Sequence, residues 1–338
     1  MYARKKAIFF DSVCGRNRVE LRDGALVSLS RPGAEMRLQR EMEEQMRYGF
    51  FTTFAPDYSF ADACALAKQA GYEGIQPRIV ASNSYDASKP LNPWGNNKHG
   101  ILEADFCKDP KAALAAVWDN GLEVTSVASY ASLEDLGRAE SLIKACGKAK
   151  IGNMRIAPLH PSAEPLLFDA NKIIKDTQER IRKVLPVSKA AGVRLCLELH
   201  PGGICASASA AVRFAEAFAP TEVGVLYDPG NLVNEGYEVP RMALSILGPY
   251  LAEIHMKNGR WVQTGTGPDG EAAWAAQSCK IEEGSYPLAA LYEVLVAMDY
   301  KGWIVEEGHE PGISTKDRLA NVLKWCRLYE KRAKAKKA

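Results

Sequence analysis

The chain contains few histidines and no strong excess of charge of either sign. Only five of its 338 residues are histidine, and 43 basic residues nearly balance 41 acidic ones, for a formal net charge of +2. So balanced a chain lacks the basic surface that binding to nucleic acid or to an anionic membrane requires. No apolar run approaches the length of a membrane span, and the four-residue apolar stretch 7–10 is too short for a signal peptide. We expect neither nucleic acid nor a membrane as a partner.

The chain also lacks any pair of cysteines spaced as CxxC. Its eight cysteines are scattered, which excludes a zinc-knuckle pattern and gives no sign of a disulfide framework. Scattered single cysteines are typical of small buried apolar residues in a reducing compartment. We expect a cytoplasmic protein.

Two hydrophobic periods alternate from Arg47 onward. Strands are predicted over 47–55, 72–80, 122–130, 153–160, 193–199, 223–228, 251–257 and 302–307. Each is followed by a predicted helix, over 59–71, 109–121, 136–151, 171–192, 207–219, 240–248, 286–300 and 314–331. Strict alternation implies parallel strands joined by right-handed crossovers, and eight units of this length predict a closed (β/α)8 TIM barrel. An open doubly wound sheet, the alternative, would show an early glycine-rich phosphate turn.

The predicted barrel covers 47–330 as a single domain. Residues 1–46 do not join the alternation, and we expect them to form a poorly ordered extension; 331–338 forms a basic, solvated tail. Two connections, 81–108 and 258–285, are longer than a barrel needs. Both lie between the end of a strand and the next helix, where barrel active sites occur.

Polar side chains end four consecutive predicted strands. Glu198 and His200 lie in LELHPG, Asp228 in YDPGN, His255 and Lys257 in HMKN, and Glu306 and Glu307 in GWIVEE. Period-two alternation places Glu198 and His200 on one face of their strand, where burial would require a partner for each. A set of carboxylates with one imidazole suits Mn²⁺, Mg²⁺, Co²⁺ or Zn²⁺. Taken singly, each residue could instead be a helix cap, a turn residue or an ion-pair partner.

In this order the motifs LELHPG, YDPGN, HMKN and YKGW, followed by a strand-end glutamate, resemble the xylose isomerase-like TIM-barrel superfamily, and within it the sugar phosphate isomerases/epimerases. The segment YGFFTTFAPDYSFADACALAKQAGYEGIQPR is similar to the first strand–helix–strand unit of that family. The resemblance implies one divalent metal ion, Mn²⁺ first and Mg²⁺, Co²⁺ or Zn²⁺ as alternatives, bound by Glu198, Asp228, His255 and Glu307. Periodicity alone does not choose between Glu306 and Glu307.

The resemblance further implies a metal-dependent isomerase or epimerase acting on a keto sugar. The metal would polarise the carbonyl while a base removes the neighbouring proton to form an enediolate. Glu198 and Glu307 are the implied proton-transfer residues, with His200 as a third candidate. Lys257 could stabilise the developing oxyanion or simply form an ion pair.

Further residues are candidates for contact with substrate. Arg78 and His160 end the second and fourth predicted strands, and Trp94, Asn97 and Trp261 lie in the two long connections. Arginine and histidine could bind a hydroxyl or phosphate, and tryptophan could stack on a sugar ring or serve loop packing.

Three rival functions remain. A lyase, dehydratase or deglycosylase acting on inososes or 3-oxo sugars begins with the same enolisation. An AP-endonuclease-like phosphodiesterase with three metals needs more histidines, and Asn231 stands where those enzymes place one. A binding protein with an inactive site would not need all four ligand positions filled. We expect a small-molecule sugar as the partner, and self-association into a homo-oligomer is compatible with the sequence.

Overall fold

The computed structural model describes residues 18–22, 25–29, 46–83, 85–161, 166–310 and 312–337. The chain divides into two compact units, Met1–Gln45 and Met46–Ala338. In the first, β1 (Arg18–Arg22) pairs antiparallel with β2 (Ala25–Leu29). The sequence patterns did not predict this hairpin. Of the predicted extension 1–46, Met46 belongs instead to the second unit, and, apart from the hairpin, the remaining residues lie outside the described ones.

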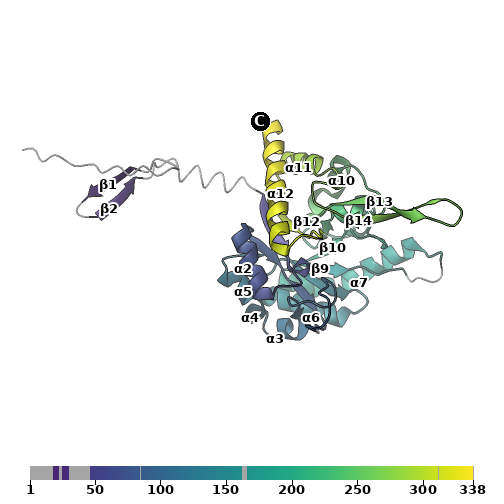
Figure 1. The fold of residues 1–338 in the computed structure, drawn as a ribbon. Helices are drawn as coiled ribbons and strands as arrows, with labels where there is room; N and C mark the ends of the chain where they lie inside the picture. Colours follow the sequence, from purple (N-terminus) through teal and green to yellow (C-terminus); the bar gives the residue numbers. More distant parts are fainter. Residues whose placement is uncertain are drawn as a thin grey trace, which may run out of the picture. The chain divides into compact units, whose positions relative to one another are not determined.

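The second unit is a parallel sheet closed into a barrel, with helices around it (Figure 1). Its strands are β3 (Arg47–Phe51), β4 (Gly74–Gln76), β5 (Arg78–Val80), β6 (Ile101–Leu102), β7 (Glu123–Val124), β8 (Val127–Ser132), β9 (Asn153–Ala157), β10 (Arg194–Glu198), β11 (Val223–Tyr227), β12 (Leu251–Met256) and β15 (Trp303–Glu306). Pro77 divides the second predicted strand into β4 and β5, and the third is divided into β7 and β8. The hydrogen-bonded order is β6-β5-β8-β9-β10-β11-β12-β15-β3-β4-β7. The two halves of the second and third strands thus stand at opposite ends of the order, which closes the barrel and confirms the predicted fold class.

The helices mostly follow the predicted alternation. They are α2 (Phe60–Ala70), α3 (Glu103–Lys108), α4 (Pro110–Ala113), α5 (Ala115–Asp119), α6 (Leu136–Lys148), α7 (Ala170–Ala191), α8 (Ala208–Ala215), α9 (Pro229–Leu232), α10 (Pro240–Leu247), α11 (Leu288–Ala297) and α12 (Thr315–Lys337), with 3-10 turns η1 (Thr52–Phe54) and η2 (Gly248–Tyr250). Helix α7 shows why the prediction works: Asp169 accepts a hydrogen bond from the amide of Lys172 at its start, and Gly192 takes φ +67° at its end.

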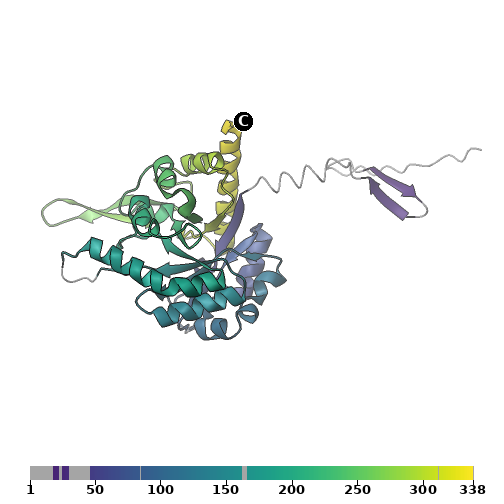
Figure 2. The same cartoon turned by 180° about the vertical axis from the view of Figure 1, so that it is seen from behind.

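Three features differ from expectation. The helix predicted over 109–121 is split into α4 and α5, and α3 precedes it. The last helix, α12, continues to Lys337, so the basic segment that we set apart as a tail is helical, and its Ala333 is buried. The connection 258–285 holds an antiparallel hairpin, β13 (Gly259–Thr266) with β14 (Ala272–Ser278), which extends away from the barrel (Figure 2).

Close packing between strands depends on small residues. A Cβ atom added at Gly74 in β4 would lie 2.6 Å from Cγ2 of Thr125. Only glycine therefore lets these neighbouring strands approach so closely.

In the part of the chain that the structure describes, no helix is long and apolar enough to cross a membrane. The seven cysteines of these residues are all free thiols, and six of them are buried; Cys14 lies outside the described residues. Their burial agrees with their predicted role as small apolar side chains.

Candidate functional site

Four side chains of metal-ligand type converge at the carboxyl ends of four neighbouring barrel strands. Each of Glu198, Asp228, His255 and Glu307 is buried and offers one ligand atom, and these atoms lie within 4.8 Å of one another. Glu198 ends β10, Asp228 follows β11, His255 lies in β12, and Glu307 follows β15. These four strands are adjacent in the sheet, so the parallel topology brings together residues that are up to 109 positions apart, from Glu198 to Glu307.

Asp228 is both a helix cap and a member of the cluster of ligand-type residues, the two roles that its sequence context allowed. It caps the short helix α9, because Oδ1 accepts a hydrogen bond from the amide of Asn231 at 2.9 Å. Its Oδ2 lies 2.8 Å from the Lys257 ammonium, inside the cluster. The cap fixes the carboxylate so that its second oxygen faces the other ligand-type residues.

The two nitrogens of His255 face different surroundings. Nδ1 lies 3.1 Å from both Glu198 Oε1 and Glu307 Oε2, whereas Nε2 lies 3.4 Å from Glu253 Oε1. Below the ring, Gln76 and Ser126 donate hydrogen bonds of 2.5 and 3.0 Å to the same Glu253 oxygen. Nδ1 is therefore the atom that points toward the cluster, whereas Nε2 faces Glu253 and the side-chain nitrogen of Gln76, which lies 3.0 Å away.

Lys257 bridges two of the four residues. Its Nζ lies 2.8 Å from Asp228 Oδ2 and 2.9 Å from Glu307 Oε2. The backbone of α9 presses against its stem, since a Cβ atom at Gly230 would lie only 2.3 Å from Cγ of Lys257. Of the two roles open to Lys257, the structure shows the ion pair. A cation already sits between two buried carboxylates at this position.

Buried charges set the protonation of the cluster. Burial alone would raise the pKa of Glu198, but Arg155, whose guanidinium lies 2.5 Å from Oε2, together with His255 lowers it to about 2. Burial would likewise raise the pKa of Glu307, but Lys257 and His255 lower it well below its usual range. Burial raises the pKa of Asp228 well above its usual range, against the effect of Lys257, and the carboxylates of Glu307 and Glu198 raise it further.

The pKa values of the two cationic partners, His255 and Lys257, are raised. Burial would lower the pKa of His255, but Glu307, Glu198 and Glu253 raise it well above its usual value. The carboxylates of Asp228 and Glu307 also raise the pKa of Lys257, against the effect of burial. A protonated His255 and the Lys257 ammonium together supply two positive charges to the cluster. The donor set thus fits a divalent cation, because a single such ion carries the two positive charges that His255 and Lys257 supply together.

The structure separates the two glutamates at the end of β15. Glu306 points toward the surrounding helices, where Oε1 accepts a hydrogen bond from the amide of Gly308 and lies 3.5 Å from Arg318 of α12. Burial raises the pKa of Glu306 to about 7 despite Arg318. Because successive side chains along a strand alternate, Glu307 points the other way, into the cluster. Geometry therefore places Glu307, and not Glu306, beside the other three.

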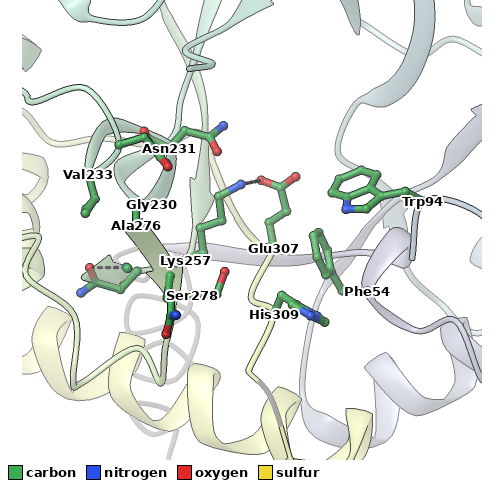
Figure 3. A pocket seen from close by; sticks show the side chains of 14 residues that line it. Phe54, Trp94, Gly230, Asn231, Val233, Lys257, Ala276, Ser278, Glu307 and His309 are labelled. Atoms are coloured by element: carbon green, nitrogen blue, oxygen red, sulfur yellow. Dashed lines mark hydrogen bonds and ion pairs between the residues drawn. The ribbon is translucent and has the colours of Figure 1, made fainter. Parts of the chain in front are cut away.

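A cavity of about 210 Å³ lies beside this cluster, and Glu307 is the one of the four residues that lines it, together with Lys257. Figure 3 shows Lys257 and Glu307 in its centre, with Asn231 and Val233 on one side and Phe54 and Trp94 on the other. The hairpin contributes Ala276, Gln277 and Ser278 to its wall, and His309 completes the side near Phe54. The cavity therefore combines a charged floor with polar and aromatic walls.

The first long connection holds one predicted substrate residue against the cavity and uses two others to support it. Trp94 lines the cavity and contacts Phe54 edge to face, with ring centroids 5.4 Å apart. Arg78 does not reach the cavity; its guanidinium donates to the carbonyls of Pro93 and Trp94 at 2.6 and 2.9 Å. Asn97 is buried within the loop and donates to the carbonyl of Gly95. Both therefore position Trp94.

The other predicted contact residues lie around the cavity rather than in its wall. His200 follows the end of β10, and its ring is exposed with Nδ1 2.9 Å from the carbonyl oxygen of Pro201. The expectation that it is buried beside Glu198 on one strand face is wrong, because the strand ends at Glu198. His160 is also exposed and lies against Gly203. Trp261 lies in β13, where its indole donates to the carbonyl of Val233 at 2.7 Å.

Sequence reasoning missed several residues of this site. Glu253 carried a usable signal, since it stands two positions before His255 and so shares its strand face. Arg155 of the fourth predicted strand could have contacted a hydroxyl, a phosphate or a carboxylate, and the structure shows the ion pair with Glu198. Phe54 and His309 gave no signal, because Phe54 lies in the 3-10 turn η1 after β3 and His309 in an irregular segment after β15.

Comparison with known proteins agrees with this fold. The family model for the xylose isomerase-like TIM barrel matches residues 64–329. No curated protein matches the chain in sequence.

Solved structures match over most of the chain at low identity. A xylose isomerase-like TIM barrel protein from Mycobacterium smegmatis in complex with magnesium is 16% identical, with TM-score 0.59 over 86% of this chain and 98% of that one. The 3-keto-D-glucoside 4-epimerase from E. coli is 15% identical, with TM-score 0.60 over 84% and 100%. The mannonate dehydratase from Streptococcus suis serotype 2 is 14% identical, with TM-score 0.57 over 86% and 94%. At these identities the likeness shows the fold, and the family match covers most of the chain. The chain belongs to the xylose isomerase-like TIM barrel family.

Proposed function

We propose that the protein is a divalent-metal-dependent isomerase or epimerase that acts on a keto sugar. The observation that carries the proposal is the buried convergence of Glu198, Asp228, His255 and Glu307, whose ligand atoms lie within 4.8 Å of one another beside a cavity. Burying three carboxylates together is costly unless cations neutralise them. Such clusters at the carboxyl ends of barrel strands are typical of active sites.

Glu198, Asp228, His255 and Glu307 would hold the metal ion, for which we propose Mn²⁺. When bound, such an ion polarises a carbonyl group and stabilises negative charge that develops on its oxygen. We assign removal and return of the proton beside that carbonyl to Glu198 and Glu307. Their lowered pKa values keep both carboxylates ionised at neutral pH, which is the form that a metal ligand and a general base both require.

Other residues would bind and orient the sugar. Asn231, Asn234 and Ser278 line the cavity and offer groups that hydrogen-bond to hydroxyls, and Trp94 offers an apolar face for a ring. Lys257 reaches the centre of the cavity (Figure 3) and could place its ammonium near a developing oxyanion. His200 is exposed and is not part of the buried cluster, so we assign it no proton-transfer role.

The test combines metal analysis with proton exchange. Protein purified with Mn²⁺ should hold about one ion per chain, and a panel of keto and 3-oxo sugars in D₂O should include one whose carbon-bound proton exchanges by NMR. Asp228→Asn should lose the metal and the exchange. Glu306→Gln is the matched control, because this neighbouring buried carboxylate faces the helices and should keep both. No bound metal, or full activity in Asp228→Asn, would refute the proposal.

A lyase or deglycosylase that starts with the same proton removal is the second candidate. The structural likeness to a mannonate dehydratase supports the lyase function as an alternative. In the same NMR experiment an isomerase returns the proton and yields a second sugar, whereas a lyase yields an unsaturated product and releases water or an aglycone. The product spectrum therefore decides between the two.

A further inference from the structure

The hairpin β13–β14 forms part of the cavity wall and then continues beyond it. Gly259 of β13 and Ala276, Gln277 and Ser278 of β14 line the cavity at the base of the hairpin. From there the two strands extend away from the barrel (Figure 1). Most of their residues are exposed. The hairpin face that carries Gly259, Ala276 and Ser278 therefore continues the cavity wall outward.

Two exposed indoles lie on the face that borders the cavity. The register pairs Trp261 with Ala276 and Gln263 with Trp274. Cross-strand partners and alternate residues share one face, so Trp261, Gln263, Trp274 and Ala276 point the same way. Trp261 is 48% and Trp274 57% exposed, and they are diagonal neighbours within reach of one ligand ring. The face is fixed to the site, because the Trp261 indole donates to the carbonyl of Val233, which also lines the cavity.

We propose that Trp261 and Trp274 form a platform for the aglycone ring of a glycoside whose sugar occupies the cavity. This inference rests on the proposed function and specifies its substrate class. The cavity, at about 210 Å³, is smaller than the ~300–1,000 Å³ of sites that enclose drug-sized ligands. It has room for a single sugar ring, so a second ring must leave it along a wall. The hairpin face with its two indoles is such a wall.

The position of the indoles favours a ligand over a second protein copy. Both tryptophans lie in the half of the hairpin nearest the cavity, whereas the outer end, Gly265-Thr266-Gly267-Pro268-Asp269-Gly270, carries no large apolar side chain. Anchor residues of a protein interface cluster near its centre, and an interface made by this projecting hairpin would be centred further from the barrel than these indoles. A third exposed indole, Trp94, also lies at the cavity.

The test measures the contribution of an aglycone ring to binding. Affinities of the Mn²⁺-loaded protein for phenyl and methyl glucopyranosides, in both anomers, are compared by calorimetry. One aromatic contact should make the better phenyl glycoside bind about 3- to 10-fold tighter than its methyl counterpart. In Trp274→Thr, which keeps strand propensity, the ratio should fall to about one. Trp118→Ala is the control, because this 41% exposed indole lies on α5, which leads into the opposite end of the barrel.

A measurement on the unmodified protein guards against misfolded variants. The indole N–H resonances of Trp261 and Trp274 should shift with the phenyl glycoside and not with the methyl one. Equal affinity for both glycosides, including no binding of either, overturns the platform. So does a Trp274→Thr variant that changes the oligomeric state but keeps the ratio, since that result makes the hairpin a protein interface. Proton exchange without a phenyl preference refutes the platform alone, and a phenyl preference without exchange refutes the proposed function alone.

Discussion

Lys257 and a divalent cation compete for the same two carboxylates. Because the ammonium lies within 2.9 Å of both Asp228 and Glu307, Lys257→Met should remove a competing charge and tighten Mn²⁺ binding about tenfold or more. The same change should lower kcat about 10²-fold if the ammonium stabilises an oxyanion. We therefore expect the Mn²⁺ affinity to rise while kcat falls. Chelator competition measures the affinity, and steady-state kinetics measure kcat.

Lys257→Arg is the matched control for charge, and it should keep the weaker metal binding. If Lys257→Met weakens metal binding instead, the lysine holds the carboxylates in place rather than competing for them. Met at this position is not expected to clash with Gly230, whose lack of a side chain already leaves room for the stem.

Glu253 is a positioning residue for His255. Its contact with Nε2 leaves Nδ1 directed at Glu198 and Glu307, and loss of such a supporting carboxylate typically costs 10–100-fold in metal affinity. We expect Glu253→Gln to lower Mn²⁺ affinity by that factor, measured by chelator competition. The nitrogen shifts of His255 in ¹⁵N NMR should change in the metal-free protein as well.

Glu253→Asp, which keeps the charge, should recover part of the affinity. A Glu253→Gln protein with unchanged His255 shifts and a lower melting temperature would show that the carboxylate is only a packing element.

At this scale, the sequence predicted the four converging residues but not their partners. Position at the ends of consecutive strands made Glu198, Asp228 and His255 candidates, whereas the choice of Glu307 over Glu306 came from the family resemblance and not from periodicity. Arg78, which begins β5, and the loop residue Asn97 could not be assigned in this way. Their hydrogen-bond partners are backbone carbonyls of Pro93, Trp94 and Gly95, and no pattern in the sequence reports where a loop directs its carbonyls.

Among the elements, the loop that carries Trp94 also contains a buried histidine. Burial, with Arg78 nearby, lowers the pKa of His99 to about 3, against about 6.5 in an unfolded chain. The unfolded state therefore binds a proton that the folded state does not, so stability falls as the pH drops below about 6.5 and continues to fall toward pH 3. The loss should be about 2 kcal/mol between pH 7 and pH 5.

His99→Gln removes this titration, so the variant should lose about 2 kcal/mol less than the wild-type protein over the same interval. Urea unfolding at both pH values measures the difference, and groups common to both proteins cancel. An equal loss in the two proteins would show that His99 is protonated in the folded state.

The hairpin β13–β14 is one of the elements that the sequence patterns missed, although it left a signal. Gly267-Pro268-Asp269-Gly270 is a turn sequence, and in the structure the amide of Gly270 donates to the carbonyl of Gly267, with Gly270 at φ +90°. The flanking strands gave no clear alternation because both faces are largely exposed. The helix predicted over 109–121 failed for another reason: Leu114, with φ −109° and ψ 7°, breaks the run between α4 and α5.

For the whole molecule, the pattern from Arg47 onward was enough to predict the closed barrel, because eight alternating units leave few other topologies. The structure also defines the N-terminal boundary of the barrel. Met46 belongs to the barrel unit: its side chain is buried and its amide donates to Glu330 Oε1 at 3.0 Å. Tyr48 donates to the other oxygen of the same carboxylate at 2.8 Å. The first barrel strand is thus fixed to α12 by Glu330.

This boundary predicts the outcome of two truncations. A chain that begins at Met46 should be soluble, keep its melting temperature within a few degrees, and retain metal binding and proton exchange. A chain that begins at Gly49 loses both donors to Glu330 and leaves that carboxylate with Lys334 as an ion-pair partner, 2.7 Å away, so the loss should cost about 1–3 kcal/mol. Thermal unfolding of the two truncations beside the full chain measures the effect. If the chain that begins at Met46 is insoluble or melts far below the full chain, residues 1–45 stabilise the barrel, and the division into an independent barrel and an extension is wrong.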